Sequence, residues 1–248
     1  MVTAPQSHPS ASDAGSTGAP GALPATRRGA AKAARRAELL TAAAKLMAQR
    51  GFAAVRLEDI GAVVGISGPA MYRYFDSKSD LLDQLLIDVS ERLVAGGEEA
   101  IAAGGRGEQV LRRLIDFHID VIVSKPDLIT VQDRELLSLS DDARHWVRSL
   151  QRRYVERWVD VLVAHDPQVR SEARVRVHAV FGLLNSSPRL PDYPAQDLRP
   201  LLAAMAWVAP QSTSFQRSEA WRLLVEQQQI LWSQQWVPYA QISPYLKR

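Results

Sequence analysis

Residues 55–82 read VRLEDIGAVVGISGPAMYRYFDSKSDLL, and this stretch decides the fold. Its first apolar residues recur at helical spacing and predict a short helix: Leu57, Ile60 and Val64. Gly65 marks a tight turn after that helix. Ser67 is a good N-cap for the next helix, and Pro69 stands in its first turn, where a missing N–H is tolerated. The stretch therefore predicts two short helices joined by a turn.

Longer helices are predicted on both sides of this pair. A helix from about Ala33 to Arg50 has apolar residues at helical spacing, and Gly51 follows it as a stop. After the aromatic step YRYF at residues 72–75, Ser77 can cap a further helix. The apolar face of that helix comprises Leu81, Leu82, Leu85, Leu86, Val89 and Leu93. The whole is the layout of a helix-turn-helix unit.

Basic residues gather in the same part of the chain. Residues 27–80 hold ten Lys or Arg and five Asp or Glu, a net charge of +5. Residues 81–248 hold 20 basic and 21 acidic residues, a net charge of −1. A small basic module attached to a neutral body is typical of a protein that contacts DNA phosphates. The sequence thus predicts double-stranded DNA as a partner.

A recognition helix presents its N-terminal half to base edges in the major groove, so slim residues suit that position. The predicted base-reading residues are Ser67, Gly68, Pro69, Ala70 and Met71. Hydroxyl and cationic side chains around them suit phosphates, which fix the register of a protein on DNA. The predicted phosphate-contacting residues are Arg27, Arg28, Arg56, Tyr72, Tyr74 and Lys78. Phe75 is expected in the core.

Two other functions stay open at this point. Short helix pairs with a glycine turn also occur in proteins that bind no nucleic acid, so the alternative is a helical protein-interaction module. The second is an all-α enzyme, but the chain has no cysteine, and His118, His145, His165 and His178 are scattered without metal-ligand spacing. We therefore expect no enzymatic activity, no cofactor and no metal.

Residues 37–82 resemble the N-terminal domain of TetR-family transcriptional regulators. The resemblance rests on an Ala-rich helix ending in RGF at 50–52, on LEDIGAVVGIS at 57–67, on the YRYF step and on Lys78 with Leu81 and Leu82. It implies a homodimer whose second and third helices bind a palindromic operator. It also implies a C-terminal helical domain that binds a small-molecule effector, and this effector releases the protein from the operator. Most such proteins are repressors.

The match departs from the family pattern in two places. Arg56 stands where the family usually has Thr, so a charged phosphate contact replaces a cap-type one. Pro69 is unusual in the recognition helix and stiffens its first turn. The GISGPA segment at 65–70 more weakly resembles actinobacterial members linked to lipid or acyl-CoA metabolism. That second resemblance implies a lipid-related effector, such as an acyl-CoA.

The rest of the chain to about Met205 is helical in pattern, and no period-2 run is long enough for a sheet, so the predicted class is all-α. Further helices are predicted over 108–124, 126–138, 141–164, 170–184 and 198–209. The predicted divisions are a disordered tail (1–26), a DNA-binding domain (27–80), a helical effector-binding and dimerisation domain (81–210) and an atypical extension (211–248). The extension holds eight of the sixteen Gln and three of the six Trp, which indicates a separately acquired segment or an altered reading frame.

Two polar residues interrupt apolar helix patterns in the C-terminal half. His118 lies in LIDFHIDVIV, and Arg134 follows the apolar run LITV, so either suits a polar anchor in a ligand pocket. The predicted ligand-binding residues are Phe117, His118, Val121, Arg134 and Trp158. The ordinary alternatives are a core histidine, a surface ion pair and a core tryptophan. Arg144, Arg148 and Arg152 share one helix face, which suits solvent or the phosphates of a CoA-type ligand.

By the same resemblance, the last two helices pack against those of a second copy. The predicted interface residues are Phe181, Gly182, Leu201, Leu202 and Met205. No run of about 18 apolar residues is present and the N-terminus does not read as a signal peptide, so we expect no membrane partner and a cytoplasmic location. The lack of cysteine fits a reducing compartment.

Overall fold

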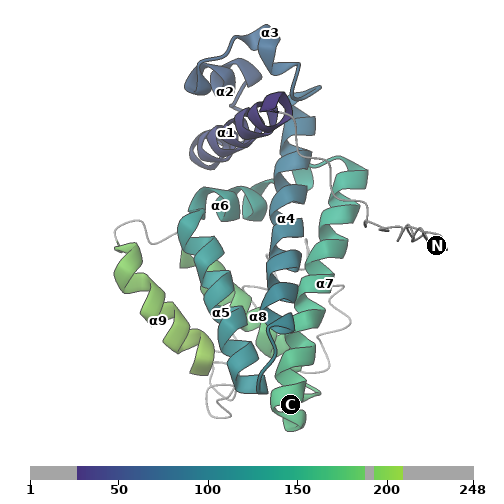
Figure 1. Cartoon of the computed structure of the whole chain (residues 1–248), viewed down its shortest axis with the longest axis vertical. Helices are drawn as coiled ribbons and strands as arrows, with labels where there is room; N and C mark the ends of the chain where they lie inside the picture. The colour runs from purple at the N-terminus through teal and green to yellow at the C-terminus, as the bar shows by residue number, and fades with distance from the viewer. Residues whose placement is uncertain (1–26, 188–192, 209–248) are drawn as a thin grey trace, which may run out of the picture. The chain divides into compact units, whose positions relative to one another are not determined.

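The computed structural model describes residues 27–187 and 193–208 (Figure 1). Over these residues the chain is helical without a strand, which confirms the predicted all-α class. Among the described residues, 36–187 and 193–208 form one compact unit, and residues 27–35, the start of the first helix, belong to another. The predictions made for residues 1–26 and 211–248 lie outside the described residues.

Four helices correspond to the helix-turn-helix part of the sequence. They are α1 (Arg27–Arg50), α2 (Leu57–Val64), α3 (Gly68–Met71) and α4 (Lys78–Ala102). α1 and α2 stop at Gly51 and Gly65, whose φ angles of 80° and 75° lie in the left-handed region that favours glycine. α3 is shorter than a usual recognition helix, and residues 72–74 continue it as a turn. The element that faces solvent is therefore a one-turn helix followed by a turn.

Side-chain and backbone caps fix where these helices begin. The Arg56 N–H donates to Asp59 Oδ2 at 3.0 Å at the start of α2. Ser77 Oγ accepts from the Asp80 N–H at 3.0 Å, which confirms Ser77 as the cap of α4. Ser67 occupies the N-cap position of α3 as predicted, but it caps through its backbone carbonyl and its hydroxyl makes no cap hydrogen bond.

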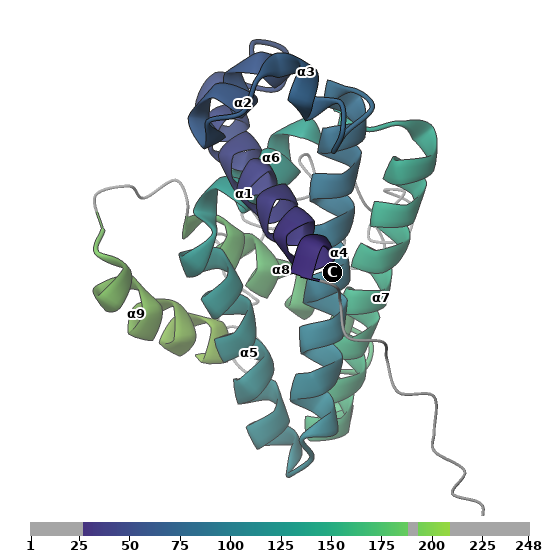
Figure 2. The same ribbon diagram turned by 45° about the horizontal axis from the view of Figure 1, so that its top comes forward.

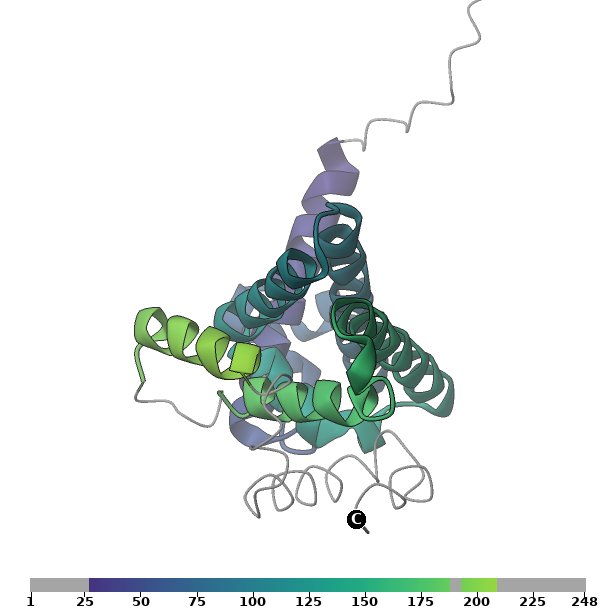
Figure 3. The ribbon, with the colours of Figure 1, turned by 90° about the horizontal axis from the view of Figure 1, so that it is seen from below.

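The C-terminal half adds five α-helices and two short 3₁₀ turns over the described residues. They are α5 (Gly107–Ser124), α6 (Pro126–Glu135), η1 (Leu136–Ser138), α7 (Asp141–His165), η2 (Pro167–Val169), α8 (Ala173–Asn185) and α9 (Ala195–Val208). α4, α5 and α7 pack side by side (Figures 1 and 2). Seen from below, α8 lies between α7 and α9 (Figure 3). These elements agree with the predicted segments to within a few residues at their ends.

Two glycines on α4 allow the neighbouring helices to come close. A Cβ atom at Gly97 would lie 2.6 Å from Cε2 of Tyr154 on α7. A Cβ atom at Gly96 would collide with the ring of Phe117 on α5. Large aromatic side chains therefore lie directly on the α4 backbone, and the core between these helices is tightly packed.

α4 runs unbroken through residue 80, where the sequence predicted the division between the two domains. That division stays a prediction. Within the described ranges, no helix is both long enough and apolar enough to cross a membrane. The same residues hold no cluster of three or more His, Asp or Glu side chains suited to a metal ion.

Candidate functional site

The helix-turn-helix exposes a group of polar and aromatic side chains. Tyr72 is 56% exposed, an unusual amount for a large aromatic residue. From the exposed residues of α2, α3 and their turns we take four that suit contact with DNA, and together with Tyr72 we call them the helix-turn-helix surface: Arg56, Ser67, Pro69 and Arg73. This surface combines two cations and a phenol hydroxyl, which suit phosphates, with a slim helix start that suits a groove.

Met71 does not belong to this surface. Its exposed fraction is 0%, and it packs on α2, where a Cβ atom at Gly61 would lie 3.1 Å from Met71 Cγ. A side chain buried between the two helices cannot reach a base edge, so the prediction that Met71 reads bases is wrong. Its neighbours Gly68 and Ala70 are half-buried and keep part of their surface in solvent.

Lys78 has a structural role that the sequence did not predict. Its Nζ donates to the carbonyl oxygens of Phe52 and Ala53, at 2.8 and 3.2 Å, and lies 4.4 Å from the centre of the Phe52 ring. These contacts use two of the three ammonium donors to hold the loop between α1 and α2. Tyr74 is half-buried against the core. Phosphate contacts by Lys78 and Tyr74 stay predictions, and the side chains of Arg27 and Arg28 lie outside the described residues.

Arg73 was not among the predicted contact residues, although it stands between the two tyrosines. It is exposed in the turn after α3, beside Tyr72. The YRYF pattern contained the signal, because an arginine between two aromatic residues in a basic segment has phosphate as its natural partner.

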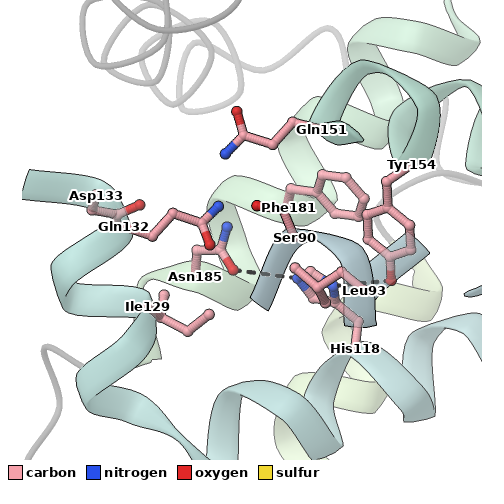
Figure 4. A pocket seen from close by; sticks show the side chains of 10 residues that line it. All are labelled: Ser90, Leu93, His118, Ile129, Gln132, Asp133, Gln151, Tyr154, Phe181 and Asn185. Carbon is pink, nitrogen blue, oxygen red and sulfur yellow. Dashed lines mark hydrogen bonds between the residues drawn. The ribbon is translucent and has the colours of Figure 1, made fainter. Parts of the chain in front are cut away.

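A pocket lies between α4, α5, α6, α7 and α8 (Figure 4). The space between its side chains, including the part that opens to solvent, is about 580 Å³. Ten described residues line it: Ser90, Leu93, His118, Ile129, Gln132, Asp133, Gln151, Tyr154, Phe181 and Asn185.

His118 links the polar side chains of this pocket. Its Nδ1 is 3.2 Å from the Tyr154 hydroxyl, and its Nε2 is 3.3 Å from Asn185 Oδ1. Burial lowers the pKa of His118 to about 4, and the hydrogen bond with Asn185 only partly opposes this. The imidazole is therefore neutral near pH 7, and a tautomer protonated at Nε2 donates to Asn185 and accepts from Tyr154. Burial also raises the pKa of Tyr154, so its hydroxyl keeps its proton.

Aromatic rings form one wall of the pocket. The Phe181 ring stacks on the rings of His118 and Tyr154, with centroid distances of 4.8 and 5.5 Å and interplanar angles of 10° and 11°. Trp158 packs edge-on to Phe181 at 4.9 Å and is 1% exposed. It supports the wall from outside the pocket lining.

Of the five predicted ligand-binding residues, the structure brings only His118 into the lining of this pocket. Arg134 is exposed and donates to the Ala48 carbonyl at 3.1 Å, so its prediction as a polar anchor of the pocket is wrong. Phe117 lies on Gly96, and Val121 is half-buried elsewhere on α5. Neither belongs to the lining residues described above.

Several lining residues were missed because they are polar residues at core positions. Gln151 lies four residues after Val147 and three before Tyr154, and all three are buried on one face of α7. Ser90 has the same place on α4, between Leu86 and Leu93. A polar residue within an apolar helical period was the available signal, and it was read for His118 and Arg134 but not for Gln151 or Ser90.

The predicted dimer residues divide into two groups. Phe181, Gly182 and Leu202 are buried within the single chain, so they cannot be presented to a second copy, and their assignment to an interface is wrong. Leu201 and Met205 are 45% and 44% exposed on α9. With Val208 they form an exposed apolar stripe at positions i, i+4 and i+7, which a second copy could cover.

α6 connects the pocket to the loop after α1. Gln132 and Asp133 line the pocket, and the next two residues contact the last turn of α1 and the loop that follows it. Arg134 donates to the carbonyl of Ala48, and Glu135 Oε1 accepts from the Phe52 N–H at 3.0 Å. Lys78 holds the same loop from α4.

Comparisons with known proteins agree with this architecture. A family model described as bacterial regulatory proteins of the tetR family matches residues 39–85, and a tetracyclin repressor-like C-terminal domain matches residues 104–189. The HTH-type transcriptional repressor KstR2 of Rhodococcus jostii is 30% identical over 149 residues, which is 59% of this chain and 73% of that protein. The chain belongs to the TetR family. It is a DNA-binding transcriptional regulator and not an enzyme.

Solved structures share the TetR fold with this chain. A TetR-family regulator from Bordetella parapertussis has a TM-score of 0.63 at 20% identity, over 69% of this chain and 93% of that one. The regulator FadR from Bacillus subtilis, solved in complex with stearoyl-CoA, has a TM-score of 0.54 at 18% identity, over 70% and 98%. At these identities the likeness concerns the fold alone.

Proposed function

We propose that this TetR-family protein is a repressor that binds a palindromic operator as a homodimer in the cytoplasm and responds to a small-molecule effector. Arg56, Ser67, Pro69, Tyr72 and Arg73 are the DNA-contacting residues of this proposal. A two-fold dimer presents two such surfaces to half-sites about one helical turn apart. The exposed stripe of Leu201, Met205 and Val208 supports a dimer through α9.

The observation that carries the DNA-binding proposal is the exposure of Tyr72. A large aromatic side chain more than half exposed, next to Arg73 in the turn after α3, is not used for packing in this chain. The alternative module, in which the aromatic residues only pack, accounts for Phe75 at 1% exposure but not for Tyr72. A phenol hydroxyl and a guanidinium in one exposed turn suit a phosphate backbone.

The effector binds in the pocket of the C-terminal helices in this proposal, and α6 carries the response. A ligand that contacts Gln132 or Asp133 displaces the following turn of α6, which holds the loop after α1 through Arg134 and Glu135. A ligand changes operator affinity only if it binds the protein more tightly with α6 in one position than with α6 in the other. An acyl-CoA remains a candidate effector, with its uncharged acyl part in the pocket. The resemblance to lipid-linked members supports it.

Binding to a duplex that spans the region upstream of its own gene tests the proposal. Fluorescence anisotropy at several salt concentrations should show that Arg73→Ala weakens binding at every salt concentration. One lost phosphate contact should lower the slope of log K against log salt by about 1. Tyr72→Ala should weaken binding, whereas Arg152→Ala removes an exposed arginine of α7 and serves as the matched control. Native mass spectrometry of the complex should show two chains per duplex.

Wild-type behaviour of both Arg73→Ala and Tyr72→Ala at all salt concentrations would refute the assigned surface. Absence of a shift on the upstream duplex with folded protein would favour the protein-interaction module. A single chain per duplex would refute the homodimer and leave the DNA-binding surface standing.

A further inference from the structure

The lining of the pocket has a charge pattern that restricts its ligand. Among the ten described residues that line it, none is Lys or Arg, and the one carboxylate is Asp133. Burial keeps His118 neutral near pH 7, so it supplies no positive charge. An anionic group placed among these residues would be desolvated without a cation to balance it. The lining therefore disfavours carboxylates and phosphates.

The same lining also holds hydrogen-bond acceptors that have no donor within the described residues. The side-chain oxygens of Gln132 and Gln151 are buried and have no hydrogen-bond donor within the described part of the chain. Gln151 as a whole is 6% exposed. Ser90 uses its own proton on the Leu86 carbonyl at 2.7 Å, so toward the pocket its oxygen can only accept. The amide oxygens of Gln132 and Gln151 thus lack a donor within the described residues, and a buried acceptor left unpaired is destabilising.

The remaining surface of the pocket suits a flat apolar body. Phe181, Tyr154 and His118 present nearly parallel rings, and Leu93 and Ile129 contribute aliphatic surface (Figure 4). Stacked aromatic walls bind rings through contact area and offset stacking.

We infer that the pocket takes an uncharged ring compound that carries a hydroxyl group, which donates to the amide oxygen of Gln151 or of Gln132. The inference rests on the proposed function, since it names the ligand class of the same effector pocket. A free carboxylate on the same ring body is rejected. An acyl-CoA satisfies this chemistry only if its acyl part carries a ring and a hydroxyl group, with the phosphates outside the pocket.

Isothermal titration of the full chain with three matched bicyclic probes tests the ligand class. 2-Naphthol is neutral at pH 7 and donates a hydrogen bond, 2-naphthoate is an anion, and naphthalene has neither group. We expect 2-naphthol to bind at least about tenfold more tightly than 2-naphthoate. Gln151→Leu should weaken 2-naphthol by about tenfold, because the hydroxyl loses its acceptor, and should leave naphthalene binding unchanged. Gln168→Leu, the same change at an exposed position of η2, is the control.

Circular dichroism establishes that Gln151→Leu is folded, and Gln132→Leu replaces it if it is not. Binding of 2-naphthoate as tight as that of 2-naphthol overturns the inference, as does no measurable binding of 2-naphthol up to its solubility. An equal effect of Gln151→Leu on naphthol and naphthalene also overturns it. The duplex-binding assay run on the same preparations reports the proposed function separately, since DNA binding without ligand does not depend on which probe enters the pocket.

Discussion

Replacing His118 with Asn should remove a large part of the acid sensitivity of this fold. The imidazole is 3% exposed, and burial lowers its pKa to about 4 from about 6.5 in an unfolded chain. Between these two values the unfolded chain takes up a proton that the folded chain does not. Stability therefore falls as the pH drops from about 6.5 toward 4, and is fully retained above that interval.

The two pKa values set the size of the effect. Proton linkage at this one site lowers the free energy of unfolding by about 2 kcal/mol between pH 7 and pH 5. Because Asn cannot titrate, His118→Asn should lose about 2 kcal/mol less than the wild type over that interval. His178, whose pKa burial and the Arg174 charge lower to about 3, is present in both proteins and cancels from the comparison.

Urea denaturation at pH 7, 6 and 5, followed by far-ultraviolet circular dichroism, measures this difference. The variant is expected to be less stable at pH 7, since it loses the stacking on Phe181, and only the change with pH is compared. His145→Asn, the same change at an exposed position of α7, is the matched control. Equal losses in the wild type and His118→Asn between pH 7 and pH 5 would refute the argument that burial holds this imidazole neutral.

Two further substitutions test the packing that positions these sites. Met71→Ala should lower the free energy of unfolding by about 2–4 kcal/mol, because the side chain is fully buried against α2. Urea denaturation measures this change, and Tyr72→Ala, which should change the free energy of unfolding by less than about 0.5 kcal/mol, is the control. Unchanged stability of Met71→Ala would restore Met71 as a DNA-facing residue. Gly96→Ala should be destabilising by about 1–3 kcal/mol although Ala favours a helix, because the new Cβ meets the Phe117 ring. Adding Phe117→Leu should recover part of that loss, and a stabilised single variant would contradict the close contact of α4 and α5.

Local sequence signals predicted the fold well, because they act over a few residues. Gly51 and Gly65 stop their helices by adopting a left-handed backbone, and Ser77 caps α4, each through chemistry visible in the sequence. The helix-turn-helix followed from those signals together with the apolar period of α2. The length of α3 did not, because residues 67–75 continue a helical pattern while the structure turns after Met71.

The pocket was harder to predict because it depends on which faces of five helices meet. His118 was found since it interrupts an apolar run, but Phe181 was assigned to a dimer interface and instead stacks on His118. The apolar spacing along a helix is the same in the sequence whether its own chain or a second copy covers that face. The prediction for Arg134 failed because the sequence does not show which face of α6 meets the pocket. Asp133 lies on the pocket face, whereas Arg134, the next residue, lies on the face that contacts Ala48.

The arrangement of α6 limits how the response of this regulator can be tuned. Residues 132 and 133 border the ligand space, and residues 134 and 135 fasten the loop under the DNA-reading helices. Under the proposed function, a substitution that loosens this helix alters ligand sensitivity and ligand-free operator occupancy together. Changes on α7 and α8, at Gln151 or Asn185, reshape the ligand space without touching that fastening. Divergence toward new inducers, in nature or in a designed biosensor, therefore has its freest positions on α7 and α8, with α6 kept as the shared output.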